Sequence, residues 1–148
     1  MTAYTMLCAA LAHLETMERQ CYSENVGTYA YRSPDGEKCL IGALIPDQVY
    51  RPVLEGYEAG HIAEHLYKAL IPEDMQRIET DLRAIPGGMY RAQGVVFLNR
   101  LQEAHDAAEG EGEAFRESVR ASIRRLCDWL DEPYPSKEEI EAARGLTV

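Results

Sequence analysis

Helical periodicity is the feature that most constrains the fold of this 148-residue chain. Apolar residues recur at spacings of three and four over long stretches, the pattern of amphipathic helices that bury one face. Proline and glycine interrupt these stretches, so each break ends one helix before the next begins. The pattern predicts helices over residues 3–20, 57–70, 73–85, 93–108 and 113–130, with a further short turn around Pro46.

A β-hairpin is predicted over residues 28–41. Thr28, Tyr29 and Tyr31 suit one strand, and Cys39-Leu40-Ile41 suits the return strand on the other side of a Ser-Pro-Asp-Gly turn. A two-stranded hairpin is marginal alone, so we expect it to lie against helices. The predicted fold is mostly α (α+β): one domain over residues 1–148 with five or six helices and one inserted hairpin. Residues 1–132 form its core, and residues 133–148 form an exposed tail.

Composition excludes several function classes. The chain has 25 acidic and 15 basic residues and a net charge of −10, so phosphate backbones repel it and we expect no direct nucleic-acid binding. A basic protein partner is compatible with this charge, and so is simple solubility. No apolar run approaches the roughly 20 residues that span a bilayer. The N-terminus lacks a basic signal-peptide region, so we expect a cytoplasmic protein with no membrane partner.

The four cysteines, at positions 8, 21, 39 and 127, form no C-x-x-C pair. We therefore expect free thiols, no disulfide and no structural zinc site. No glycine-rich phosphate loop stands between a strand and a lysine-bearing helix. We expect no cofactor, and the sequence predicts no oligomeric state.

Two motifs stand out. The stretch YRSPDGEKCLIGALIPDQVY begins at Tyr31, and an FLNRLQEAHD patch contains Leu101, Gln102, His105 and Asp106. Together they resemble a family of small proteins common in phage and bacterial genomes, for which the resemblance implies no activity. It implies a setting instead, that of accessory proteins of phages and mobile elements, some of which inhibit host defence systems. The first motif's matching residues are Tyr31, Arg32, Gly36, Lys38, Cys39, Ile41, Gly42, Leu44, Ile45, Pro46, Asp47, Tyr50, Glu55 and Gly56.

The enzymatic hypothesis is a hydrolase or transferase that uses Cys39 as nucleophile and His105 as base, with Asp106 as orienting acid. A helix beginning near Ile41 would lower the pKa of the Cys39 thiol. The apolar neighbours of Cys39 instead favour a buried structural thiol, whose replacement by serine would leave a poorly paired hydroxyl and cost about 1–3 kcal/mol. Asp106 follows His105 directly, so on a helix the two side chains should diverge by about 100°.

Two other patterns could hold ions. His61 and His65 in HIAEH formally match a zinc-peptidase pattern, although a third protein ligand is missing from it. Arg116, Arg120 and Arg124 recur every four residues and could bind an anion, which makes a nucleotide or anion sensor a further alternative. The same arginines could simply pair with Glu113, Glu117 and Asp128, which lie three or four positions away.

The favoured interpretation is a non-enzymatic module that binds a host protein or protein complex. Tyrosine and arginine are enriched at interface hot spots, and Tyr29, Tyr31 and Arg32 lie together on the predicted hairpin. An acidic loop adds Glu109, Glu111 and Glu113. With the setting that the resemblance implies, these residues predict a small acidic accessory protein, such as an anti-CRISPR-like inhibitor of a host defence complex.

Overall fold

The computed structural model describes residues 1–25, 27–75 and 93–146. It confirms a mostly helical α+β fold with one two-stranded antiparallel hairpin. In chain order the elements are α1 (Ala3–Leu14), β1 (Tyr22–Ser23), β2 (Thr28–Tyr29), α2 (Leu40–Leu44), the 3₁₀ helix η1 (Pro52–Gly56), α3 (Ala59–His65), α4 (Tyr67–Leu70), α6 (Gln93–Asp106), α7 (Gly112–Leu130) and α8 (Lys137–Ala142).

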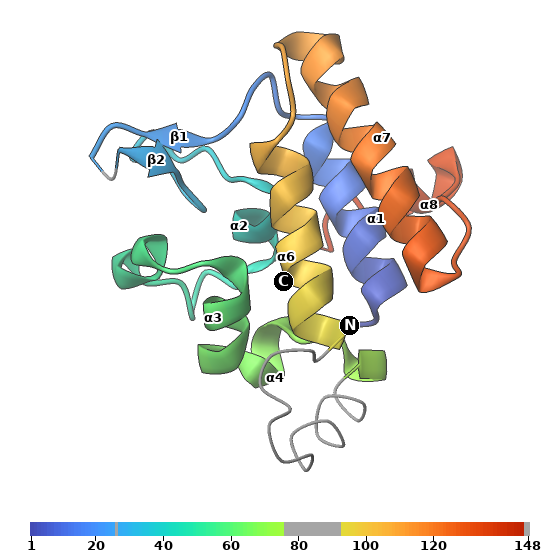
Figure 1. Cartoon of the computed structure of the whole chain (residues 1–148), viewed down its shortest axis with the longest axis horizontal. Coiled ribbons are helices and arrows are strands. Elements are labelled where there is room, and N and C mark those ends of the chain that lie inside the picture. The colour runs from blue at the N-terminus through green and yellow to red at the C-terminus, as the bar shows by residue number, and fades with distance from the viewer. Residues whose placement is uncertain (26, 76–92, 147–148) are drawn as a thin grey trace.

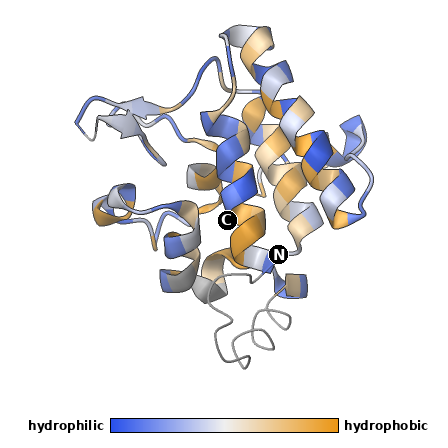
Figure 2. Cartoon of the chain, in the orientation of Figure 1, coloured by the Kyte–Doolittle hydropathy of each residue, from blue (hydrophilic) through white to orange (hydrophobic). Residues whose placement is uncertain are grey.

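Helices α1, α6 and α7 form the main packed layer, with the hairpin and the η1–α3 segment on one side of it (Figure 1). Helix α1 is buried along most of its length because alanines and leucines occupy nearly every face. The buried residues of α6 include Phe97, Leu98, Leu101, Ala104 and His105. In α7, Ile123 is buried while its neighbour Ser122 is partly exposed, and hydrophilic and apolar residues alternate around the helix (Figure 2).

Helix α1 ends at Leu14, six residues before the predicted boundary. The hydroxyl of Thr16 donates to the carbonyl oxygen of His13 at 2.7 Å, and the backbone amide of Met17 donates to Leu14. These bonds close a turn in place of the next helical turn. The predicted helix over 57–70 is likewise divided at Leu66 into α3 and α4. The predicted helix over 73–85 lies almost entirely outside the described residues.

The hairpin lies earlier in the chain than predicted. Tyr22 pairs with Tyr29 and Ser23 pairs with Thr28. Around the Ser33–Gly36 turn only one bridge forms, between Arg32 and Lys38. The predicted return strand over residues 39–41 is wrong, because Cys39 caps α2 and the chain turns helical at Leu40.

The C-terminal segment contacts α1. Ser136 and Glu139 form a capping box at the start of α8, and the Tyr4 hydroxyl donates to Glu139 at 2.9 Å. Ala143 is buried against Cys8 and Ala12 of α1, although the residues of α8 itself remain largely exposed. In the part of the chain that the structure describes, no helix is both long and apolar enough to cross a membrane.

Candidate protein-binding surface

A carboxylate clamp holds the chain just after the hairpin. Glu55 lies on η1, whose first turn begins at Pro52, a residue suited to a helix start. Its two carboxylate oxygens accept from the backbone amides of Tyr31 at 2.8 Å and Arg32 at 2.9 Å, and one also accepts from the Tyr50 hydroxyl at 2.6 Å. Desolvation and this carboxylate raise the pKa of Tyr50 to about 12. These bonds hold residues 31 and 32, which follow β2, against η1.

Arg32 joins the same structural unit. Its guanidinium donates to the carbonyl of Ile45 at 2.6 Å, pairs with Asp47 at 2.8 Å and lies 4.3 Å from the centre of the Tyr50 ring. Lys38 also pairs with Asp47, and the two cations lower the pKa of that carboxyl. Arg32 therefore supports the fold and is not free to contact a partner, contrary to the prediction for it.

Tyr31 is also committed to the fold. It is 5% exposed, and its hydroxyl donates to the carbonyl oxygen of Tyr57 at 2.6 Å. Gly42 packs directly on the Tyr31 backbone, where any Cβ atom would overlap the carbonyl group. The first motif thus specifies how residues 31–56 fold, and of the three predicted hairpin contact residues only Tyr29 lies at the surface.

Cys39 is fully buried, as the sequence predicted for a structural thiol. It is the N-cap of α2, and its sulfur accepts from the Gly42 amide at 3.2 Å. The sulfur also lies 3.8 Å from Oε1 of Gln102. Burial raises the pKa of the thiol and outweighs the backbone donors at the helix start, so the expected activation by that helix is absent from this site.

His105 has both ring nitrogens occupied. Nε2 accepts from the Cys21 amide at 3.0 Å, and Nδ1 lies 2.7 Å from Oδ1 of Asp106, to which it donates in this tautomer. The predicted divergence of the His105 and Asp106 side chains is wrong, because the two meet at this bond and Gln102, which donates to the same oxygen at 2.8 Å, helps hold the carboxylate beside the ring. The His105–Asp106 pair makes no direct bond to Cys39 among the described contacts; Gln102 lies between them and contacts both Asp106 and the Cys39 sulfur. A buried neutral thiol without a free base is unsuited to nucleophilic catalysis.

The N-cap role of Cys39 changes the expected effect of replacing it. A serine hydroxyl at this position can still accept from the Gly42 amide and so keep the cap, whereas Oε1 of Gln102, 3.8 Å from the sulfur, lies beyond the reach of an O–H···O bond. We expect Cys39→Ala to lose about 1–2 kcal/mol of unfolding free energy relative to Cys39→Ser, because alanine removes the cap. Urea denaturation of the two variants measures the difference, and equal losses would exclude the capping role.

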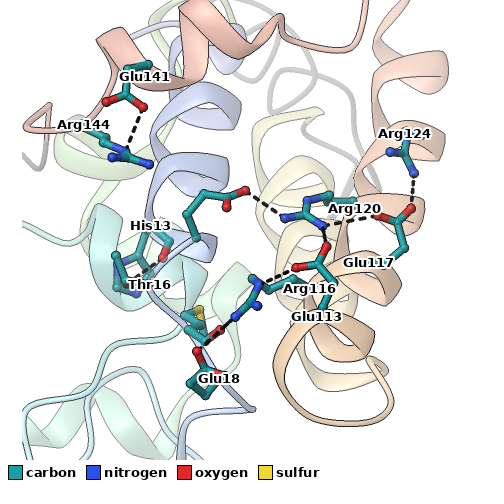
Figure 3. Close-up of polar contacts among 12 residues, drawn as sticks. His13, Thr16, Glu18, Glu113, Arg116, Glu117, Arg120, Arg124, Glu141 and Arg144 are labelled. Atoms are coloured by element: carbon teal, nitrogen blue, oxygen red, sulfur yellow. Dashed lines mark hydrogen bonds and ion pairs between the residues drawn. The ribbon is translucent and has the colours of Figure 1, made fainter.

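The arginines of α7 are paired with carboxylates (Figure 3). Arg116 contacts Glu18 and Glu113, at 3.2 and 3.0 Å, and Arg120 contacts Glu15 at 2.9 Å. Arg120 and Arg124 also pair with Glu117. These contacts link α7 to the end of α1, and the predicted partner Asp128 takes part in none of the described ion pairs. The three arginines predicted as a possible anion site are therefore already neutralised by carboxylates of the protein. One of these is Glu113, which was itself predicted as an acidic contact residue.

His61 and His65 lie exposed on α3 and flank the Tyr57 ring, with centroids 6.5 and 5.6 Å away. Within residues 1–25, 27–75 and 93–146, no group of three His, Cys, Asp or Glu side chains is placed to hold a metal ion.

Three exposed tyrosines mark the side of the molecule that carries the hairpin. Tyr22 is 50% exposed, Tyr29 37% and Tyr57 43%. The rings of Tyr22 and Tyr29 meet edge to face at a centroid distance of 6.2 Å. Tyr29 also packs edge to face on the buried His105 ring at 5.9 Å, which anchors it. Tyr22 and Tyr57 were not among the predicted contact residues, and it is the fold that brings them beside Tyr29.

Two pockets border Tyr29. The hairpin pocket, of about 660 Å³, lies between the hairpin and the loop before α7 and is lined by Tyr22 and Tyr29. The α3 pocket, of about 440 Å³, lies between β2, η1, α3 and α6 and is lined by Tyr29 and Tyr57. We call the three tyrosines with these two pockets the tyrosine–carboxylate face.

Carboxylates dominate both pockets. The hairpin pocket has one lining base, Arg19, against Glu24, Asp35, Glu37 and Glu111. Among the described residues, no Lys or Arg lines the α3 pocket; its four lining carboxylates are Glu55, Glu58, Glu103 and Asp106. Of the predicted acidic contact residues, Glu111 lines a pocket, whereas Glu109 is exposed outside both of them.

Comparison with known proteins gives no match to any family model, and none among the curated proteins or the solved structures.

Proposed function

We propose that this chain is a non-enzymatic protein-binding module and that the tyrosine–carboxylate face is its contact surface. The observation that carries the proposal is the grouping of three exposed tyrosines around two acidic pockets. Tyrosine supplies a large, rigid contact area at low entropic cost and is enriched at interface hot spots. The alternatives lack such support, because Cys39 is a buried cap and the α7 arginines are neutralised.

The partner surface that fits this face is basic. Nine charged residues line the two pockets in the described part of the chain: eight carboxylates and one cation, Arg19. Complementary charge steers encounter and raises the association rate, while the tyrosines supply the buried contact. A nucleic-acid partner does not fit, since phosphates would meet carboxylates.

The biological setting is part of the proposal. The resemblance of the Tyr31 motif to small phage and bacterial proteins favours an accessory protein of a phage or mobile element that acts in the cytoplasm. Its partner would be a host protein or complex, and an acidic protein that covers a basic, nucleic-acid-binding surface would inhibit a host defence complex by competing with the nucleic acid. The negative charge of this protein is sufficient for such competition, because it would be attracted to the same basic surface that binds the nucleic-acid phosphates.

Affinity capture with the tagged full chain tests the proposal. We expect the wild-type protein to retain a near-stoichiometric bacterial protein that Tyr22→Ser/Tyr29→Ser loses. The matched control is Val53→Ser/Leu146→Ser, which changes two exposed apolar residues, 67% and 47% exposed, that line neither pocket. Retention of the same protein by the tyrosine variant, or its equal loss from the control, would reject this face as the contact surface.

A further inference from the structure

We infer that the α3 pocket binds the side chain of one arginine of the partner, an inference that rests on the proposed protein-binding function. Residues from four elements line this pocket of about 440 Å³, so it is built by the tertiary fold and not by one loop. The Glu55 clamp and the bond from the Gly60 amide to Asn99 at 2.8 Å hold its walls together. The site is therefore preorganised for a ligand, which reduces the entropic cost of binding.

The pocket is negatively charged, and no cationic side chain lines it in the part of the chain that the structure describes. Glu58 and Glu103 make no hydrogen bond or ion pair with any described residue through their carboxylates, unlike Glu113 and Glu117 beside the α7 arginines. Oδ1 of Asp106 accepts from Gln102 and His105, and both oxygens of Glu55 accept from neutral donors. Four negative charges thus face one cavity, which favours a cationic ligand.

The arrangement favours a guanidinium over a metal ion or an ammonium. The lining carboxylates do not approach one another closely enough, in the described residues, to form a metal-holding group of three. A guanidinium spreads five donors over a plane and can reach carboxylates that are further apart, whereas an ammonium is a point charge.

Aromatic walls add to this preference, because Tyr29, Tyr31 and Tyr57 line the pocket and guanidinium groups stack on tyrosine rings. The protein already uses that contact internally. Arg32 lies over Tyr50 at 4.3 Å, and Arg124 lies over Tyr134 at 5.0 Å. The exposed Tyr57 ring at the α3 pocket offers the same contact to a residue from another molecule.

A titration with three small probes tests the inference. The full ¹⁵N-labelled chain is titrated with Nα-acetyl-arginine amide, Nα-acetyl-lysine amide and the neutral isostere Nα-acetyl-citrulline amide. We expect the arginine probe to shift the Gly56 and Ala59 amides and the Gln102 side-chain amide, with a Kd on the order of 1–10 mM. The lysine probe should bind more weakly and citrulline should give no saturable shift. Equal binding of lysine or citrulline, or no arginine shift at these groups, would overturn the inference.

Charge-removing variants provide the second arm. Glu58→Gln/Glu103→Gln should weaken the arginine probe by about fivefold, as expected for two partly exposed ion pairs. Asp128→Asn/Glu138→Gln removes the same charge from exposed residues outside the pocket whose carboxylates pair with no described residue, and should leave Kd within about twofold. Equal weakening by both variants would show only a general charge effect and reject the site. Protein capture by the tyrosine face is measured separately, so loss of the arginine site alone leaves the proposed function standing.

Discussion

Gly42→Ala is expected to lower the free energy of unfolding by at least about 3 kcal/mol, the largest effect of any single methyl group in the described part of the chain. A Cβ at this position would overlap the carbonyl group of Tyr31. That backbone cannot move away freely, because Glu55 holds the Tyr31 amide and the Cys39 amide donates to the same carbonyl at 3.0 Å. With a typical stability of about 5–15 kcal/mol, such a loss leaves a marginal fold.

The matched control for this prediction is Gly56→Ala. A Cβ at Gly56 meets no atom within 4 Å, and its backbone is not in the left-handed region. We expect Gly56→Ala to change the stability by no more than about 0.5 kcal/mol. Urea denaturation followed by circular dichroism compares the two, and similar midpoints would show that the close approach of α2 to Tyr31 is absent in solution.

Glu55→Gln is expected to cost about 2–4 kcal/mol. The carboxylate accepts three hydrogen bonds, and a glutamine amide must turn its NH₂ group toward at least one of the donors. Glu58→Gln, at a neighbouring carboxylate that accepts no described hydrogen bond, should change stability by no more than about 0.5 kcal/mol. Thermal and urea unfolding measure both variants, and a neutral Glu55→Gln would mean that the clamp does not hold.

The clamp also gives a pH dependence. The pKa of Tyr50 is raised from 10.0 to about 12, so folding favours its neutral form. This contribution to stability is complete below pH 10, where the unfolded phenol is also protonated, and is lost as the pH rises from 10 toward 12. We expect Tyr50→Phe to weaken the decline in stability over that range, relative to the wild-type protein.

Much of the fold could be predicted because local pattern and burial agree. The apolar stripe of α6 and the glycine and proline breaks placed most helices correctly. The errors arose where a hydrogen bond between a side chain and the backbone three residues away decided the local structure. Residues 39–41 have the apolar, β-suited composition of a strand, yet the cap from Cys39 to Gly42 starts a helix there. Similarly, hydrogen bonding by Thr16 ended α1 early.

The candidate surface was harder to predict. Tyr29 and Glu111, which line the proposed surface, were among the predicted contact residues because a tyrosine-rich segment and an acidic loop are visible in the sequence. Tyr31 and Arg32 look like hot-spot residues, but the carboxylate and carbonyl partners that bury them lie 13–26 positions away. Glu58 and Glu103 meet at one pocket only because α3 packs on α6. No local sequence pattern predicts that these two carboxylates lie at the same pocket.

Hydrogen–deuterium exchange of the full chain, with and without its purified partner, tests the central claim most directly. We expect the partner to protect the amides of residues 21–31 and 55–60, while those of α8 exchange at an unchanged rate. Protection confined to α7 and α8, with the hairpin and η1–α3 segments unaffected, would contradict the assignment of the tyrosine–carboxylate face as the binding surface.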